Sequence, residues 1–203
     1  MTTNVAATVA GCPVPVGDVD AREARLRATR LANSLPRPDT SEGRQLRRWL
    51  TQLVVTDRVV AAEARALGVS VDGAPSELEL LPDMSARLEI GSVAASALES
   101  PIARALFVHV TAAVVVGAAE VAEFHARNPF RFASRAPGSD GWSARIEPSF
   151  DDVRQAITEH LRAAARRREF RIWLDARRAA LVELSPGYEH PGDPRQPDNT
   201  HKH

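Results

Sequence analysis

Cysteine and lysine are nearly absent from this chain, and each scarcity excludes a class of feature. Cys12 is the single cysteine, so no disulfide can form within the chain and no Cys-x-x-Cys motif exists. Lys202 is the only lysine among 26 basic residues, which 26 acidic residues balance to a formal net charge of zero. This balance gives no reason to expect a nucleic-acid or anionic-membrane partner. Arginine in place of lysine, with abundant alanine, is typical of a GC-rich genome such as an actinobacterial one.

Long apolar runs are missing as well. The longest, residues 105–119, is interrupted by His109 and Thr111 and is too short to span a bilayer. The first residues, MTTNVAATVAGCPVPVG, have neither the basic segment nor the continuous apolar segment of a secretory signal. We therefore expect a cytoplasmic protein without a membrane partner. The sequence also has no glycine-rich phosphate loop and no Gly-x-Ser-x-Gly motif.

Helical periodicity is what the chain does contain, and its 203 residues suffice for one domain with a hydrophobic core. The clearest helix is predicted over residues 41–68, where Gly68 is a natural C-terminal stop. A long helix is predicted over residues 150–181, with Ser149 and Asp152 in capping-box positions. At about 1.5 Å per residue this helix spans roughly 45 Å, so it reaches from one lobe to another. Its apolar stripe shifts to another face part of the way along.

Weaker signals predict the remaining elements. After a short extended segment, Asp20 and Glu23 have the spacing of a capping box at the start of the first helix. Pro101 fits the first turn of another helix, although residues 105–116 are compatible with a helix or a strand. Composition and periodicity further predict short helices at 76–81, 84–90 and 118–128, a loop at 133–148, and a short strand at 181–184.

Four stretches in this order are similar to the helical chaperone module of the SurA and PrsA type of parvulin foldases. They are ATVAGCPVPVGDVDAREARLR, LRRWLTQLVVTDRVVAAEARALGVSV, VVVGAAEVAEFHARNPFRF and the closing SFDDVRQAITEHLRAAARRREFRIWLDARRAALVEL. The resemblance implies a mainly α fold over residues 1–184, with a long C-terminal helix and minor short strands. In the foldases an isomerase domain interrupts the module, and here only the loop 133–148 occupies that place. Prolyl isomerase activity is therefore not expected.

An irregular tail, residues 185–203, follows this predicted domain and concentrates metal-binding side chains. Glu189, His190 and Asp193 lie within five positions, and His201 and His203 follow a proline-rich spacer. Two histidines with a carboxylate are a recurrent ligand set for catalytic zinc or non-haem iron. The tail is therefore a candidate site for a divalent metal, although a solvated tail without a site is the common alternative.

Other chemically reactive side chains have simpler explanations. Cys12 is expected to be a small buried residue, and His160 to lie in solvent opposite the apolar stripe of the long helix. His109 and His125 are expected to be surface or hydrogen-bonded histidines. The run from Arg166 to Arg168 is expected to be a solvated face, with an acidic partner or a phosphate as the alternative.

Two functional hypotheses follow from these features. The first is a metal-dependent enzyme or accessory protein, acting on a small molecule, in which the tail supplies the metal site on a foldase-like scaffold. An actinobacterial setting associates it with specialised metabolism. The second is a chaperone-like protein that binds an unfolded or partner polypeptide without isomerase activity. A small-molecule binder or an oligomeric structural protein is a third possibility, for which the sequence offers neither support nor objection; the long helix could pair with a second copy.

Overall fold

The protein is mainly helical, with one small three-stranded sheet, as the sequence predicts. The structure is a computed structural model that describes residues 4–132, 134–135, 145–146 and 148–193. Its elements are β1 (Val5–Val9), β2 (Cys12–Pro15), α1 (Val16–Arg27), the 3₁₀ turn η1 (Ala32–Ser34), α2 (Ser41–Ala66), α3 (Glu77–Leu80), α4 (Met84–Ile90), α5 (Ser92–Ala97), α6 (Pro101–Val110), α7 (Ala118–Arg127), β3 (Ser134–Arg135), β4 (Arg145–Ile146), α8 (Phe150–Leu181) and β5 (Val182–Leu184).

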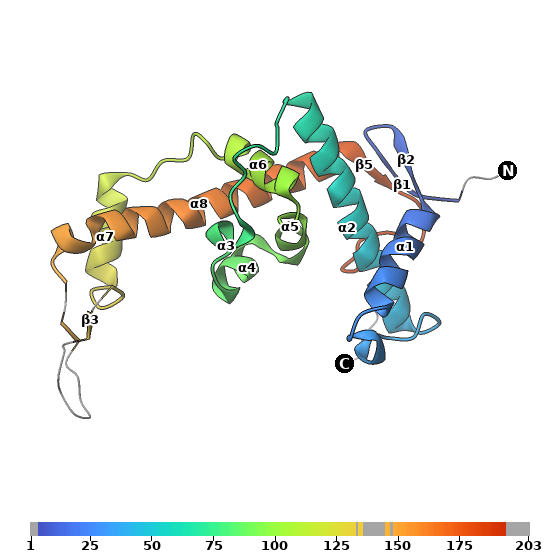
Figure 1. Cartoon of the computed structure of the whole chain (residues 1–203), viewed down its shortest axis with the longest axis horizontal. Coiled ribbons are helices and arrows are strands. Elements are labelled where there is room, and N and C mark those ends of the chain that lie inside the picture. The colour runs from blue at the N-terminus through green and yellow to red at the C-terminus, as the bar shows by residue number, and fades with distance from the viewer. Residues whose placement is uncertain (1–3, 133, 136–144, 147, 194–203) are drawn as a thin grey trace.

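Helix α8 runs along the length of the molecule, and α7, α4, α6 and α2 pack against successive parts of it (Figure 1). It begins where the capping residues predict, because the Ser149 hydroxyl accepts a hydrogen bond from the Asp152 amide at 3.3 Å. Its first turns pack against α7 through Val153 and Ile157. Its middle contacts α4 and α6, and its last turns contact α2. The helix therefore connects two separately packed ends of the molecule.

Three apolar clusters make up the interior. The largest joins α2, α4, α5, α6 and α8 around Phe107 and Phe170, whose ring centroids are 5.1 Å apart. A second cluster lies between the sheet and helices α1 and α2, with Val19 and Leu50 almost fully buried. The third, smaller cluster surrounds Ile157, where α7 meets α8. Between the largest and the smallest cluster, the turns of α8 have fewer neighbours to cover them (Figure 1).

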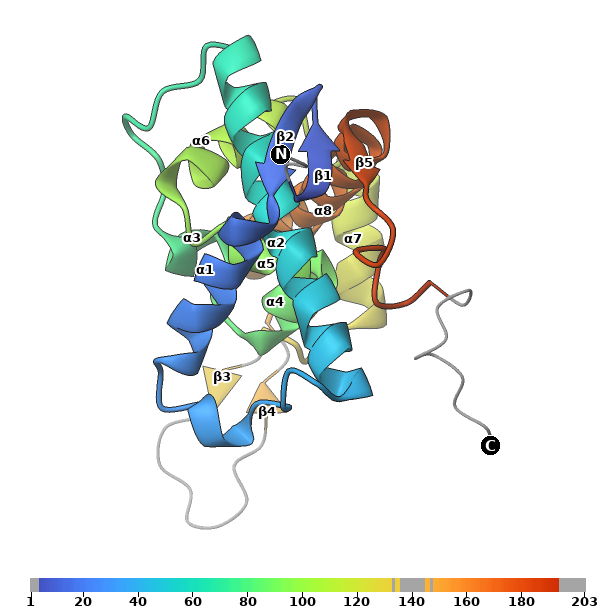
Figure 2. The ribbon, with the colours of Figure 1, turned by 90° about the vertical axis from the view of Figure 1, so that its right-hand side faces the viewer.

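The sheet has the order β2-β1-β5, and all its pairs are antiparallel (Figure 2). Ala10 and Gly11, which connect β1 to β2, have φ values of 50° and 76°. Two consecutive residues with positive φ are the requirement of a type I′ hairpin turn, so the predicted extended segment is a hairpin. Strand β5 directly follows α8 and pairs with β1, which fastens the end of the long helix to the start of the chain.

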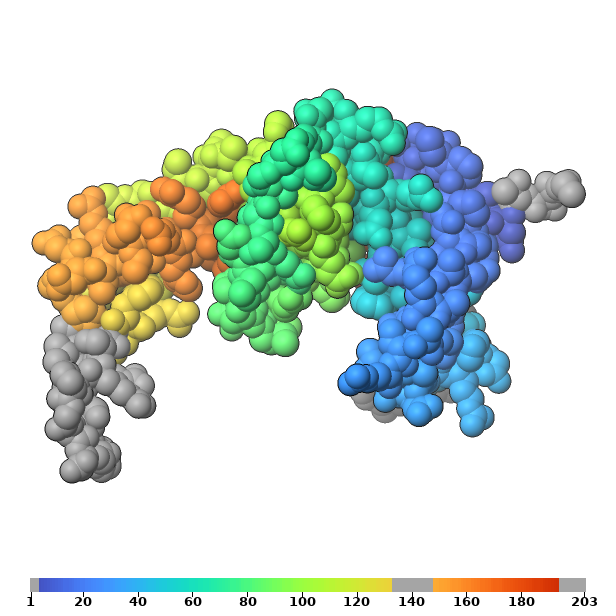
Figure 3. All heavy atoms as spheres, viewed as in Figure 1, coloured from blue at the N-terminus to red at the C-terminus, as the bar shows by residue number. Residues whose placement is uncertain are grey.

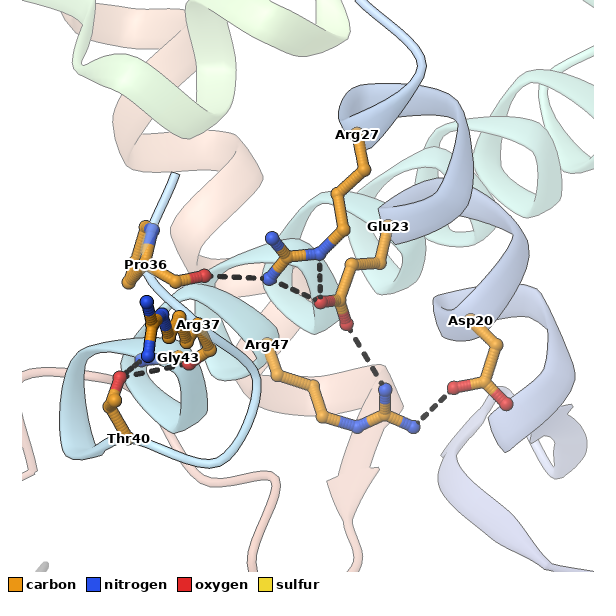
Figure 4. A network of polar contacts seen from close by, with 8 residues as sticks. All are labelled: Asp20, Glu23, Arg27, Pro36, Arg37, Thr40, Gly43 and Arg47. Carbon is orange, nitrogen blue, oxygen red and sulfur yellow. Dashed lines mark hydrogen bonds and ion pairs between the residues drawn. The ribbon is translucent and has the colours of Figure 1, made fainter. Parts of the chain in front are cut away.

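Helix α1 does not start at Asp20, so that part of the sequence-based prediction is wrong. It begins four residues earlier, at Val16, directly after the hairpin. Asp20 and Glu23 are instead bound by Arg47 of α2, which donates to Asp20 Oδ1 at 2.5 Å and to Glu23 Oε2 at 3.3 Å (Figure 4). Glu23 Oε1 also accepts from Arg27 Nε at 2.8 Å. These carboxylates stabilise the α1–α2 contact rather than the start of a helix.

The turn before α2 is closely packed against the first turn of that helix (Figure 4). The Thr40 hydroxyl accepts from the Gly43 amide at 3.1 Å and donates to the Arg37 carbonyl oxygen at 2.8 Å. A Cβ atom on Gly43 would lie 1.9 Å from that same carbonyl oxygen. Only glycine fits at this position of the helix.

The ambiguous parts of the chain are also resolved. Residues 105–110 are helical, as part of α6, and an irregular segment follows up to α7. The predicted loop 133–148 contains the short antiparallel pair β3 and β4. The short helices α3 and α4 are present where predicted, whereas α5 has no counterpart in the prediction. None of the helices in the described part of the chain is both long and apolar enough to cross a bilayer.

Candidate functional site

The first nine residues of the predicted tail lie against the rest of the protein. The Ser185 amide donates to the Ala6 carbonyl oxygen at 3.0 Å, which extends the pairing of β5 with β1. The Tyr188 side chain packs against the second apolar cluster, and the Arg47 guanidinium lies 5.8 Å from the centroid of its ring. Residues 185–193 are thus attached to the surface formed by α2 and the sheet.

The three described candidate metal ligands of the tail are engaged in local turns. Glu189 Oε2 accepts from the Gly187 amide at 2.8 Å. His190 Nδ1 accepts from the Gly192 amide at 3.0 Å, and the Asp193 amide donates to the His190 carbonyl oxygen at 2.9 Å. These contacts shape the backbone and do not direct the side chains toward one ion.

The hydrogen bond at His190 has a direct consequence for metal binding. A neutral imidazole carries one donor nitrogen and one acceptor nitrogen, and here Nδ1 is the acceptor. Nε2 then carries the proton and has no lone pair for a metal. His190 could become a ligand only after its bond with Gly192 breaks.

The described residues contain no group of three or more histidine, cysteine, aspartate and glutamate side chains that could hold a metal ion. His201 and His203, the other two predicted ligands, lie outside the described residues. A divalent metal, zinc or iron, in the tail therefore stays a prediction.

Two expectations about reactive side chains are wrong. Cys12 is exposed rather than buried; it shares the face of the buried Val14, but it directly follows the turn at Ala10 and Gly11, at the tip of the hairpin. His160 is half-buried rather than solvated, since its ring lies 5.6 Å from the ring of Phe124 and 6.1 Å from that of Phe132. Burial, together with the charges of Arg131 and Arg167, lowers the pKa of His160 below its ordinary value.

The other two histidines are in the places expected for surface groups. His109 is exposed at the end of α6. His125 is partly buried, with Nε2 3.3 Å from the Pro148 carbonyl oxygen. Neither lies in a cluster of potential metal ligands within the described ranges.

The arginine run of α8 is only partly a solvated face. Arg167 is buried and forms an ion pair with Glu89 of α4, with Nη2 2.7 Å from Oε2. Arg166 packs over the Phe107 ring at 5.1 Å and donates from Nε to the Thr111 hydroxyl at 2.8 Å. Arg168 alone of the three is exposed. The run therefore contributes to tertiary packing as well as to the surface.

A hollow lined by described residues lies along the central turns of α8. We call it the α8 trough, and it has a volume of about 800 Å³. Apolar side chains of α8 and of the segment before α7 form its floor: Val114, Leu161, Ala164, Ala165 and Ile172. Ile172 is 50% exposed. The trough therefore presents apolar surface to solvent between the two packed ends of α8. On the face drawn in Figure 3, atoms of α8 (orange) reach the surface beside α4 (green).

Charged side chains of both signs surround this floor. Glu89, which is paired with Arg167, and Arg171, which donates to the Glu89 carbonyl oxygen at 3.2 Å, lie at the α4 side. Glu120, Arg168 and Glu169 complete the rim and form no hydrogen bond or ion pair with another described residue. The rim thus offers free charges of both signs beside an apolar floor.

Sequence reasoning did not identify this surface, although one signal was present. The apolar stripe of α8 shifts face between Leu161 and Phe170, because the first half packs against α7 and the second half against α4 and α6. Leu161, Ala165 and Ile172 form a third row, each about one or two turns from the next. Leu161 is partly covered by the cluster around Ile157, Ala165 is partly buried and Ile172 is half exposed, and this row contributes to the floor of the trough.

The comparisons with known proteins cover only the N-terminal part of the chain. The model of a family described as a family of unknown function (DUF7158) matches residues 5–42, which comprise β1, β2, α1 and the turn before α2. No curated protein and no solved structure matches the chain. The matched segment contains Asp20, Glu23 and Arg27 of the α1–α2 contact and none of the residues that line the α8 trough.

Proposed function

We propose that this protein binds an extended, apolar stretch of another polypeptide in the α8 trough, as a chaperone-like binding protein without prolyl isomerase activity. The observation that carries the proposal is the open apolar floor of the trough with its rim of free charges. The likeness of the chain to the helical module of parvulin foldases supports the same function. We further propose that it acts in the cytoplasm.

The dimensions of the trough suit a short stretch of extended chain. Leu161 and Ile172 are eleven residues apart on one helix, which corresponds to roughly 16 Å at about 1.5 Å per residue. An extended polypeptide rises about 3.3 Å per residue, so about five residues span this distance. The two alanines between these ends, Ala164 and Ala165, leave space for side chains of the bound segment.

The rim favours polypeptides over one defined small molecule. A small-molecule pocket normally encloses its ligand and places a few convergent polar groups around it. Here the floor is exposed, and the free charges of Glu120, Arg168 and Glu169 are of mixed sign. A mixed rim can meet polar groups of either sign on both sides of an apolar core, which suits partners of varied sequence.

Replacing Ile172 with aspartate tests this proposal. Half of the side chain is exposed, so the fold should tolerate the change, while a charge on the floor should weaken binding of an apolar peptide at least tenfold. The measurement is fluorescence anisotropy with a labelled apolar decapeptide, together with suppression of aggregation of an unfolded model client.

Leu31→Asp is the matched control, because Leu31 is 57% exposed and lies between α1 and α2, outside the trough. It should leave both readouts unchanged. Equal loss in the two variants, or no binding by the unmodified protein, would contradict the proposal.

A divalent-metal site in the tail is a second proposal, with the protein then acting as a metal-dependent enzyme or accessory protein on a small molecule. One observation favours it: His190 and Asp175 of α8 line the same recess of about 200 Å³ beside Arg178. His190 would need to exchange its bond with Gly192 for the metal, and Glu189 has a second carboxylate oxygen available. The proposal requires His201 or His203 to supply further ligands.

Elemental analysis of untagged protein tests the metal proposal. We expect about one equivalent of zinc or iron, reduced to background in a His201→Ala, His203→Ala double variant. His109→Ala, which alters an exposed histidine on α6, is the control and should retain the metal. Background metal in the unmodified protein would end this proposal without affecting the first.

A further inference from the structure

A second recess lies beside the α8 trough, and its lining differs from that of the trough in charge. It has a volume of about 320 Å³ and is bounded by α6, the segment after it, and α8. Among the described residues that line it, Arg162 and Arg166 are the charged ones, and apolar groups such as Val108 and Val115 provide its walls. Val114 lines both this recess and the trough, so the two hollows adjoin.

The two arginines of this recess contact no carboxylate of the described residues. Arg162 forms no hydrogen bond or ion pair there, and Arg166 uses only its Nε atom, toward Thr111. By contrast, the buried Arg167 forms an ion pair with Glu89, and the partly buried Arg177 forms one with Glu63. The terminal nitrogens of Arg166 are thus available to a ligand.

The positions of Arg162 and Arg166 on α8 favour the binding of an anion between them. Arg162 and Arg166 are four residues apart on one helix, so their side chains are neighbours and their like charges repel. Burial and the charge of Arg162 both lower the pKa of Arg166. An anion between the two guanidinium groups would relieve the repulsion and supply the missing hydrogen-bond acceptors.

The walls indicate what kind of anion fits. Val115 is 80% exposed and Val108 is 40% exposed, so apolar groups adjoin the two charges. A planar carboxylate matches the fork of a guanidinium group, and an apolar residue next to that carboxylate would cover the valines. An isolated inorganic anion would leave these walls exposed.

We propose that Arg162 and Arg166 form a carboxylate-binding subsite, which holds an acidic side chain or a C-terminal carboxylate adjacent to the apolar stretch bound in the trough. This inference rests on the proposed peptide-binding function. It adds a preference to that function: among apolar segments, those flanked by a carboxylate bind more tightly than those flanked by a neutral group.

The test compares labelled decapeptides that share one apolar core and differ in the residue at either end, glutamate or glutamine, with acid or amide termini. We expect the peptides with a carboxylate to bind roughly tenfold more tightly, which is about 1.4 kcal/mol. In Arg162→Gln and in Arg166→Gln this preference should disappear, while the affinity for the neutral peptide stays unchanged. Arg162 is exposed, so its replacement leaves the fold intact even if that of Arg166 does not.

Arg65→Gln, which removes an exposed arginine from α2, is the control and should keep the preference. Equal affinity for acidic and neutral peptides, or a preference that persists in both subsite variants, would overturn the subsite. If no peptide binds, the proposed function fails. The subsite is then tested separately by titration with octanoate, which carries one carboxylate on an apolar chain. A saturable shift of an arginine Nε–H resonance that is lost in Arg166→Gln would then support the subsite, and no saturable shift would overturn it.

Discussion

In the α1–α2 corner Asp20, Glu23, Arg27 and Arg47 each have an opposite charge beside them, whereas on the central turns of α8 several charges have none among the described residues. Arg47 meets both Asp20 and Glu23 in the corner (Figure 4). On α8, Arg162 and Arg168 meet no carboxylate, and the apolar floor between them faces solvent. Both regions are built from amphipathic helices rich in arginine and alanine.

The difference separates residues that hold the fold from residues that are available to a partner. Paired charges in a packed corner contribute to folding, because their hydrogen bonds are complete without any other molecule. Unpaired charges beside exposed apolar side chains gain nothing in the free protein. Water solvates them in the free protein, and they remain available to another molecule that supplies opposite charges and apolar groups.

The largest effect is expected for Gly43→Ala in the closed corner. A Cβ atom would lie 1.9 Å from the Arg37 carbonyl oxygen, and because that oxygen belongs to the backbone the turn must move. We expect a loss of about 2–4 kcal/mol in the free energy of unfolding, measured by urea denaturation.

Gly17→Ala is the matched control for this change. Gly17 lies near the start of α1, and a Cβ atom there meets nothing within 4 Å. The replacement should be neutral or stabilise by up to about 1 kcal/mol. Similar effects of the two substitutions would show that the corner is less tightly packed than the structure indicates.

A smaller effect is expected when arginines of the two regions are exchanged for glutamine. Arg47→Gln should cost about 1–2 kcal/mol, because it removes hydrogen bonds to two carboxylates and the contact with the Tyr188 ring. Arg162→Gln should change the free energy of unfolding by less than about 0.5 kcal/mol, since Arg162 has no partner among the described residues. Urea denaturation of both variants measures these changes. Equal losses in the free energy of unfolding would contradict the comparison.

The smallest effect concerns the pH dependence of stability at the α7 end of α8. Burial lowers the pKa of His160 from the ordinary 6.5, so the folded protein binds this proton less tightly than the unfolded chain does. The stability of the fold is therefore lost in part as the pH falls below about 6.5 toward the folded-state pKa. Between pH 7.5 and 5.5, the Tm should fall by a few degrees more than that of His160→Gln, as measured by circular dichroism. An equal fall in the two proteins would assign the pH dependence to other groups.

The helices were predictable where the local signals agreed. The 3.6-residue periodicity identified α2 and α8, and Ser149 and Pro101 marked the starts of α8 and α6 correctly. The start of α1 was misplaced because Asp20 and Glu23 have the spacing of a capping box, although in the fold they bind Arg47 from another helix. The spacing of residues along the chain does not reveal which charged side chain of another helix will pair with them in the fold.

The candidate site was less predictable than the fold for the same reason. The sequence pointed to the tail, where potential ligands are close together in the chain, and the described part of the tail forms local turns. The trough and the carboxylate subsite combine residues of α4, α6, the segment 111–117 and α7 with residues of α8, which lies much further along the chain. No short motif can represent such a surface.

By itself, the sequence determined that this protein is mainly helical, because the periodicity of apolar side chains and the caps of helices are local properties of the chain. Only the tertiary structure decided which faces of those helices are covered, because coverage depends on contacts between distant segments. Leu161 and Ile172 are as apolar as Ile157 and Leu174, yet the latter are buried and Ile172 is half exposed. The surface of α8 that is open to a partner is the part that α4, α6 and α7 do not cover.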